Sequence, residues 1–276
     1  MILRILLLIA FLLSSSSAWA TDWCDDANTS GCWTTETGSG TTLDDISSNS
    51  HDGTFKGAGE PAWSATVPTS ATDGFQGTST YSVLFDGTDD KITVANHADF
   101  NYTTGTFCFW LYAESNSNNP SVLSKHSSNG SRSGIHVYLS GGQIVFQIKK
   151  DGNAPQPYTS PNEAISLDTW HHVCGSFAPN GSECSFTFDG ITKDSANAAY
   201  DWAFSTEDLL MADSPDSFWG ELDGNLDEII WYAQAQLDST DINDIMDNGL
   251  VQATAPTITR LYNATIHSAT MYGITQ

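Results

Sequence analysis

The chain has 276 residues, with 9 basic against 33 acidic side chains and a formal net charge of −24. Nucleic acid is excluded as a partner, because its phosphates must be met by Lys and Arg side chains that this sequence lacks. The acidic residues are scattered among Ser, Thr, Asn and Gly, which is typical of a solvated surface. Binding of a divalent cation would require a few sites where acidic residues converge.

Residues 1–20 have the pattern of a secretory signal peptide. Arg4 precedes an apolar run that ends at Leu13, and the segment closes on the small-residue pattern Ala18-Trp19-Ala20. The run is too short for a membrane span, and no second apolar stretch follows it. We therefore expect a secreted protein, extracellular or on the cell surface, that does not span a membrane.

The five cysteines of an exported chain predict disulfides. Cys24 and Cys32 would close a small loop. Cys174 and Cys184 flank an Ala-Pro-Asn-Gly turn signal, and facing residues of a hairpin bring their Cα atoms to about 4.5–5.5 Å, within reach of a disulfide. Cys108 then remains as a buried, small apolar residue.

Short runs of β-branched and aromatic residues recur between clusters of Gly, Asn, Asp and Ser. This spacing predicts an all-β sandwich or barrel. The segment from residue 21 to residue 250 has an ordinary length for a single sandwich. The runs are 81–87, 91–96, 106–113, 135–142, 143–150, 170–177 and 185–191.

Helical periodicity is present at one place near the C-terminus. Asp238 can cap a helix that places Ile242 and Ile245 on one face, and Gly249 would end it. Residues 251–276 then repeat weakly in fives, with an apolar residue in the fourth place of each copy. This segment predicts either a frayed tail or extra edge strand, or a docking element for self-assembly.

Four segments occur in this order along the chain: "CWTTETGSGTTLDDISSNSHDGTFKG", "LFDGTDDKITVAN", "DTWHHVCGSF" and "FWGELDGNLDEIIWYAQAQLDSTDINDIMDNG". Together they resemble the laminin-G-like, concanavalin A-like jelly-roll family over Trp33 to Gly249, with Ser48 where the family usually has Gly. The resemblance implies an all-β, two-sheet antiparallel jelly-roll sandwich with one short helix near the C-terminus. Because this sandwich hosts binding modules, adhesins and hydrolases, function must be argued from the sites.

The resemblance also implies a calcium site. Asp45 and Asn49 stand where the family places ligands of an ion that joins the first loop to the closing strand, and oxygen ligands of this kind suit Ca²⁺. If Ile229 and Trp231 face the core, period-two alternation places Asp227 on the same side, where a carboxylate needs a cation or several donors. The alternative is that Asp45 and Asn49 make side-chain turns and that Asp227 accepts backbone hydrogen bonds.

The acidic residues of the closing strand raise the question of catalysis. Glycoside hydrolases of this sandwich carry Glu, Asp and Glu at alternate positions of one strand, since retaining chemistry needs two carboxyls about 5–5.5 Å apart. Glu221 and Asp223 fit this pattern, but Asn225 stands in the place of the second Glu and cannot transfer the proton. The sequence therefore favours a non-catalytic domain over an atypical glycosidase.

Aromatic residues in the loops are candidates for carbohydrate binding. Ligand sites combine aromatic surfaces with a few polar groups that fix orientation. For each aromatic residue, packing in the core is the alternative. The candidates, including one carboxylate that could accept sugar hydroxyls, are Tyr158, Tyr200, Trp202, Asp216 and Trp219.

These observations predict a secreted, non-catalytic recognition module that binds a glycan or another extracellular surface protein and carries a structural calcium ion. One alternative is a structural or adhesive component of an extracellular assembly, with residues 251–276 as the docking element. An atypical glycosidase is the other.

Overall fold

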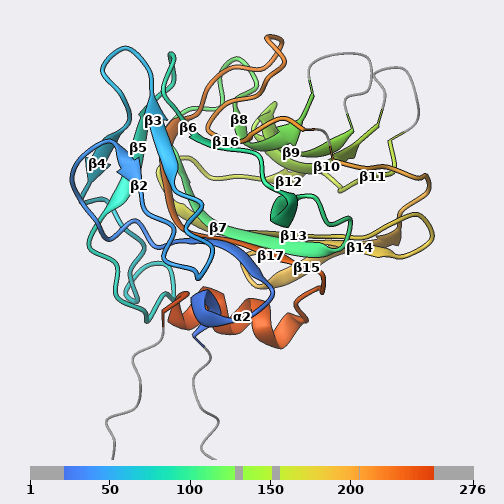
Figure 1. Ribbon diagram of the computed structural model, residues 1–276. Helices are drawn as coiled ribbons and strands as arrows, with labels where there is room; N and C mark the ends of the chain where they lie inside the picture. Colours follow the sequence, from blue (N-terminus) through green and yellow to red (C-terminus); the bar gives the residue numbers. More distant parts are fainter. Residues whose placement is uncertain (1–21, 128–132, 151–155, 205, 252–276) are drawn as a thin grey trace, which may run out of the picture. The chain divides into compact units, whose positions relative to one another are not determined.

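The computed structural model describes residues 22–127, 133–150, 156–204 and 206–251. The predicted signal peptide, and the predicted tail from residue 252 onwards, lie outside these residues, so export and self-assembly stay predictions. The described residues form two antiparallel sheets packed as a sandwich, with one α-helix, which confirms the predicted fold (Figure 1). In this part of the chain no helix combines the length and the apolar character that a membrane crossing requires.

Sheet A is the layer that lies next to the helix in Figure 1. Its strand order is β15-β14-β13-β7-β17-β5-β4, and β1 pairs with β17 beside this path. The strands of sheet A are β1 (Thr29–Trp33), β4 (Ala62–Ser64), β5 (Ser82–Asp86), β7 (Gly105–Ala113), β13 (Trp170–Phe177), β14 (Glu183–Phe188), β15 (Ile191–Asn197) and β17 (Asp223–Ala233).

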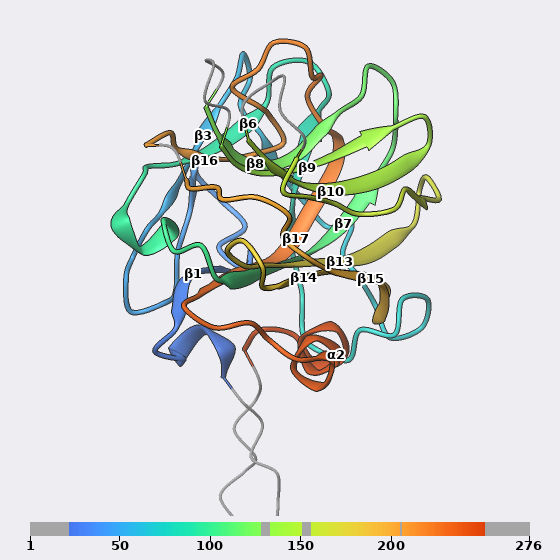
Figure 2. The ribbon, with the colours of Figure 1, turned by 90° about the vertical axis from the view of Figure 1, so that its right-hand side faces the viewer.

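Sheet B forms the opposite layer, as Figure 2 shows from the side. Its strand order is β11-β10-β9-β8-β16-β6-β3-β2, and β12 pairs with β10 beside this path. The strands of sheet B are β2 (Thr42–Leu43), β3 (Gly53–Lys56), β6 (Lys91–Val94), β8 (Ser121–His126), β9 (Gly134–Ser140), β10 (Gln143–Lys149), β11 (Tyr158–Thr159), β12 (Glu163–Ala164) and β16 (Leu209–Met211). Two 3-10 turns, η1 (Trp23–Asp25) and η2 (Ala98–Phe100), lie outside the sheets.

The core between the sheets follows from period-two alternation. In β7, Phe107, Phe109 and Leu111 point into the sandwich, whereas Cys108 and Trp110 point to the other face of sheet A. All five side chains are buried, because α2 and its neighbouring segments cover that other face as well. The strand therefore reads as a continuous apolar run rather than as a polar and apolar alternation.

The helix α2 (Ser239–Asn248) forms where the sequence predicts it. The Asp238 side chain accepts hydrogen bonds from the N–H groups of Thr240, at 2.7 Å, and Asp241, at 3.0 Å, which satisfies two donors that a helix start leaves free. Ile242 and Ile245 pack against the outer face of sheet A. A cap and a periodic apolar face were sufficient to predict this element.

Two disulfides lie on the outer face of sheet A, and one of them was predicted. Cys24 and Cys32 are bonded as expected, with Cα atoms 5.4 Å apart. The second disulfide joins Cys108 of β7 to Cys174 of β13, which face each other with Cα atoms 4.2 Å apart. Cys184 is a free, buried thiol. The predicted disulfide between Cys174 and Cys184, with Cys108 left over, is therefore wrong.

The error lies in the register of the β13–β14 hairpin. Cys174 pairs with Thr187, not with Cys184. A shift by an odd number of residues moves a side chain to the opposite face of a sheet. Cys184 accordingly points into the sandwich core, whereas Cys174 lies under α2. The sequence located the turn but not its centre, and the centre decides which cysteines meet.

A β-bulge interrupts β17 at Asp227 and Glu228. Pairing with β7 shifts after Asp227, and Glu228 has a φ of 46°. Ile229 and Trp231 face the core as expected, but Asp227 pairs with Trp110 on the outer face of sheet A. Because the bulge adds a residue to β17, alternation fails across it. The prediction that Asp227 lies on the core side is corrected.

Candidate functional site

The segment that follows β16 folds back over the outer face of sheet B. The carbonyl oxygen of Asp213 accepts hydrogen bonds from the hydroxyls of Ser121, at 2.9 Å, and Ser124, at 2.8 Å, both on β8. The hydroxyl of Ser214 lies 3.3 Å from the Nε2 of His126. These contacts bury polar groups with partners and fix the start of the segment on the sheet.

Trp219, further along this segment, is held against β9. Its ring centroid lies 4.3 Å from that of Tyr138 and 4.7 Å from that of His136, and both residues point outward from β9. Phe218 meets the Trp219 ring edge-on at 5.1 Å and is 70% exposed. An exposed apolar ring beside an aromatic ring fixed by its neighbours makes this surface the candidate binding site.

A cavity of about 340 Å³ opens beside these two aromatic rings. The Nζ of Lys149 lies 5.6 Å from the centroid of Trp219, within the range of a cation–π contact. At the rim, the backbone N–H of Lys150 donates to the Oε1 of Gln156 at 2.8 Å. The described lining residues are Gln147, Lys149, Lys150, Gln156, Asp216, Phe218 and Trp219.

Of the predicted carbohydrate-binding residues, Asp216 and Trp219 line this cavity. Tyr200 lies beside it, since the Nζ of Lys150 is 5.7 Å from the Tyr200 ring centroid, and Tyr200 is 40% exposed. Tyr158 and Trp202 belong instead to the hydrophobic core, where they are 4% and 8% exposed. This corrects the prediction for these two residues, because neither presents a ring face to a ligand.

Sequence reasoning missed the β10 side of the cavity. In β10, Ile144, Phe146 and Ile148 point into the core, so Gln147 and Lys149 point outward toward Trp219. The signal was present in the run "QIVFQIKK", which combines outward-facing polar residues with two adjacent lysines in a chain that has few. The run predicts a strand, but only the folded segment after β16 shows what covers it.

A second cavity, of about 440 Å³, lies at β7 and β13. Its aromatic side consists of Tyr112 and Trp170, whose ring centroids are 5.5 Å apart. Trp170 is buried, and the polar lining comes largely from threonines of the loop after β4. This cavity lacks the highly exposed ring and the lysines that distinguish the first one.

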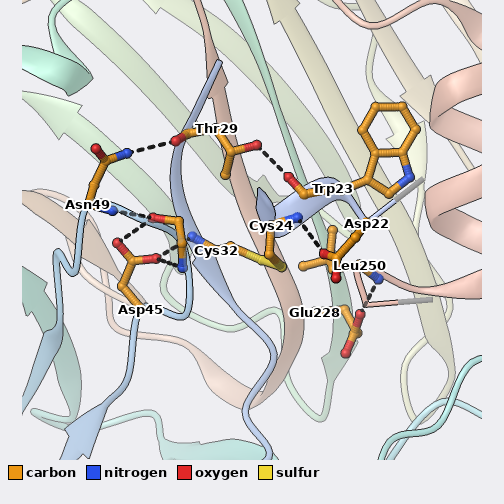
Figure 3. Close-up of a disulfide and its surroundings, with 10 residues drawn as sticks. Asp22, Trp23, Cys24, Thr29, Cys32, Asp45, Asn49, Glu228 and Leu250 are labelled. Carbon is orange, nitrogen blue, oxygen red and sulfur yellow. Dashed lines mark hydrogen bonds between the residues drawn. A yellow bond between two sulfur atoms is a disulfide. The ribbon is translucent and has the colours of Figure 1, made fainter. Parts of the chain in front are cut away.

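The first loop, which the resemblance links to calcium, is held by Asp45. Its Oδ1 accepts from the backbone N–H groups of Cys32, at 2.8 Å, and Ser47, at 2.9 Å. Its Oδ2 accepts from the Ser47 hydroxyl at 3.0 Å and from the N–H of His51 at 2.7 Å. Figure 3 shows this carboxylate beside the Cys24–Cys32 disulfide. Four donors fill the acceptor sites of one carboxylate.

Asn49 and Asp227 also have protein partners. The side-chain amide of Asn49 donates to the carbonyl of Thr29 at 2.8 Å (Figure 3). Asp227 accepts from the hydroxyls of Thr35 and Ser79 and from the following backbone N–H. Because the donors around Asp45 and Asp227 occupy the lone pairs that a cation needs, these two carboxylates as arranged do not fit a calcium ion. Calcium binding at these residues stays a prediction, and it requires the donors to move.

The carboxylate row of the closing strand does not lead into either cavity. Asp223 pairs with Asp86 on β5, and burial together with the charge of Asp86 raises the pKa of Asp223. Asn225 is buried and donates to the hydroxyl of Ser82 at 2.9 Å. Neither Glu221 nor these two β17 residues line the 340 Å³ or the 440 Å³ cavity.

The family model described as concanavalin A-like lectin/glucanases superfamily matches residues 86–243, more than half of the chain. The chain belongs to this superfamily. The match runs from the end of β5 into α2 and therefore includes β10 and the segment after β16 that build the cavity. No curated protein matches the chain.

Several solved structures share the superfamily fold. Domain 4 of AbnA, an extracellular arabinanase from Geobacillus stearothermophilus in complex with arabinotriose, has a TM-score of 0.60 and 15% identity, covering 80% of this chain and 100% of that chain. The binding domain of Paraclostridial Mosquitocidal Protein 1 has a TM-score of 0.59 and 13% identity, covering 79% and 52%.

Botulinum neurotoxin type C, whose cell entry is described as dependent upon interaction with two ganglioside molecules, has a TM-score of 0.57 and 13% identity, covering 80% and 51%. The chain thus spans about half the length of the toxin structures that it matches. At these identities the likeness shows the fold, and the superfamily member described here must be assigned a function from its own residues.

Proposed function

We propose that this superfamily member is a secreted, non-catalytic recognition module that binds a glycan carrying an acidic group at the cavity beside Trp219. The observation that carries the proposal is the pair of aromatic rings, Phe218 and Trp219, at a cavity that also holds amide and ammonium groups. The two disulfides support an extracellular location, since such bonds persist in oxidising compartments.

The aromatic rings supply the apolar part of the site. Contacts with Tyr138 and His136 hold the Trp219 ring before a ligand arrives, so little side-chain freedom is lost on binding. A sugar ring has an apolar C–H face that can lie on such a surface. The amides of Gln147 and Gln156 lie in the same cavity and can both donate to and accept from hydroxyl groups.

The two lysines determine which glycans we expect. Of the six lysines of the sequence, Lys149 and Lys150 both line this cavity, in a chain with 33 acidic residues. A negatively charged ligand is repelled by most of the surface and attracted here, which favours this orientation of approach. A carboxylate or sulfate group on the sugar would form a charge-assisted hydrogen bond with the ammonium of Lys150, while Lys149, buried against Trp219, adds positive charge beneath it.

Hydrolysis is disfavoured by the composition of the site. Glycosidases of the usual kinds need two carboxyl groups on either side of the bond that breaks. Among the described residues that line the cavity, Asp216 is the one carboxylate. A single carboxylate can accept sugar hydroxyls, but it cannot act as both acid and nucleophile. Carbohydrate binding without cleavage is also compatible with the complex of AbnA domain 4 with arabinotriose.

A glycan array with the chain from Thr21 onwards tests the proposal. We expect acidic glycans to bind, and Trp219→Ala to weaken the tightest of them at least about tenfold, because truncating a central aromatic contact of an interface costs about 2 kcal/mol or more. Tyr102→Ala serves as the control, since Tyr102 is 42% exposed and lies outside the cavity. Absence of any glycan ligand, or equal binding by Trp219→Ala and the native chain, would refute the proposal.

A further inference from the structure

Three potential metal ligands meet at a second place, away from the glycan cavity. His51 lies in the loop between β2 and β3, and His97 and Asp99 lie at the start of η2. The Oδ2 of Asp99 is 2.9 Å from the Nε2 of His51 and 2.9 Å from the Nδ1 of His97. The three ligand atoms all lie within 4.8 Å of one another. Two segments far apart in the sequence thus converge on one point.

We propose that His51, His97 and Asp99 bind a divalent transition metal ion of the zinc type. Two imidazole nitrogens and one carboxylate oxygen are a donor set that Zn²⁺ accepts, in contrast to the oxygen ligands that Ca²⁺ prefers. Zinc bonds of about 2.0–2.1 Å in a tetrahedron separate the ligand atoms by roughly 3.3 Å. The observed separations of 2.9 Å must therefore widen by a few tenths of an ångström.

The side chains can make this adjustment while one coordination position stays open. His97 and Asp99 have side chains that are 54% and 34% exposed, whereas the His51 side chain is 15% exposed. His51 is thus the fixed ligand. The other two can move by small torsional changes, and for His97 this means giving up the long 3.4 Å hydrogen bond that its Nδ1 accepts from the backbone N–H of Asp99. Their exposure also leaves room for water as the fourth ligand, the arrangement of an open zinc site.

The backbone around the ligands is fixed from both sides. The N–H of His51 donates to Asp45 at 2.7 Å, and its carbonyl accepts from the Nε1 of Trp33 at 3.1 Å. The carbonyl of Asp99 accepts from the hydroxyl of Ser30 at 2.8 Å. Ser30 and Trp33 both belong to β1, so a single strand positions the two ligand segments. These hydrogen bonds hold the backbone of the ligand residues in place before an ion arrives.

The other convergent groups of the described residues lack one of these properties. Cys108, Cys174 and His172 lie together, but the two cysteines form a disulfide and all three residues are buried. Asp86 and the neighbouring aspartates of the β5–β6 turn supply carboxylates alone. The His51–His97–Asp99 cluster combines accessible imidazoles, a carboxylate and an anchored backbone. A metal ion there would fasten the β2–β3 loop to η2.

Isothermal titration of the EDTA-stripped chain with ZnCl₂ tests this site. We expect one Zn²⁺ per chain, and at least about tenfold weaker binding in His97→Ala and in Asp99→Asn, since even the loss of a supporting partner costs tenfold or more. His267→Ala removes an imidazole outside the described residues and serves as the matched control. We expect Zn²⁺ to raise the melting temperature (Tm) of the native chain and of the control, and Ca²⁺ to have no such effect at this cluster.

X-ray absorption of the zinc-loaded chain gives an independent readout, with two imidazole ligands expected at zinc. Circular dichroism identifies any variant that fails to fold, in which case His97→Asn replaces it. No saturation below about 1 mM Zn²⁺ would overturn the assignment. So would zinc binding of equal strength in the native chain and both site variants, or a zinc shell without imidazole.

Discussion

Glu228 accepts a hydrogen bond from the backbone N–H of Leu250, with 2.7 Å between its Oε2 and that nitrogen (Figure 3). The contact joins the bulge of β17 to the residue that follows the last turn of α2. Leu250 in turn accepts a hydrogen bond from the N–H of Trp23 at 3.0 Å. One buried carboxyl group therefore connects the closing strand, the helix end and, through Leu250, the N-terminal turn.

The burial of Glu228 next to Asp227 makes stability depend on pH. Burial raises the pKa of Asp227 to about 7, and burial together with the charge of Asp227 raises the pKa of Glu228 well above its usual value. Between the unfolded pKa values near 4 and these raised values, the folded state binds more protons than the unfolded state. The contribution of this pair to the free energy of unfolding is therefore largest below about pH 4. It falls as the pH rises toward and through 7.

Glu228→Gln isolates the effect, since its amide oxygen can still accept from Leu250 but cannot ionise. Urea unfolding of both proteins at about pH 5 and pH 8 measures it, and we expect the native chain to lose on the order of 2 kcal/mol more than the variant over this interval. Parallel pH profiles in the two proteins would show that Glu228 is already ionised in the folded state.

The revised disulfides predict the outcome of thiol labelling. All five cysteines lie in the described residues, and four of them are paired. Alkylation in denaturant without reductant should therefore label Cys184 and no other cysteine, and Cys184→Ala should abolish labelling. Recovery of a peptide in which Cys174 is bonded to Cys184 would show that the Cys108–Cys174 disulfide does not form.

The two disulfides should differ in their contribution to stability. Their cysteines are 66 residues apart in Cys108–Cys174 and 8 residues apart in Cys24–Cys32. Loop-closure entropy predicts that removing the longer link costs about 4 kcal/mol and removing the shorter one about 2.5 kcal/mol. Paired Cys→Ser variants compared by denaturant unfolding measure both values. A larger loss for the shorter link would contradict the entropic argument.

Lys150→Gln should change the selectivity of the proposed glycan site. The loss of one ammonium group should weaken an acidic oligosaccharide several-fold at low salt and leave a neutral analogue unchanged, since the charge pair is partly solvated and screened by ions. Affinities at two salt concentrations give the measurement. Lys193→Gln is the matched control, because Lys193 pairs with Glu163 at 3.5 Å and does not line the cavity. If Lys150→Gln weakened the acidic and the neutral oligosaccharide equally, the charge of Lys150 would not determine specificity.

Calcium can be tested by melting the chain in EDTA and in excess Ca²⁺. Because hydrogen-bond donors already surround Asp45 and Asp227, we expect the same Tm in both conditions, in the native chain and in Asp227→Asn. Saturation at a hundredfold excess over the dissociation constant would instead add about 2.7 kcal/mol. A rise of that size in the native chain, absent from the variant, would establish the calcium site and show that the loop rearranges.

Local features of the sequence determined the elements that depend on neighbouring residues. The runs at 106–113, 143–150 and 170–177 became β7, β10 and β13, because β-branched and aromatic side chains between turn residues suit an extended strand. The cap at Asp238 and the glycine at 249 predicted α2 for the same reason. Cys24 and Cys32, close in sequence, met as expected.

Only the tertiary structure decided the features that depend on register and on what covers each surface. The bulge at Glu228 moved Asp227 to the outer face of sheet A, and the hairpin register separated Cys174 from Cys184. Trp202 and Trp219 both lie in loop segments of the sequence. Trp202 packs in the core, whereas Trp219 lines a cavity together with residues of β10. The two-residue alternation of a strand sets which side chains share a face. Contacts between residues far apart along the chain decide whether that face meets the core, a ligand or water.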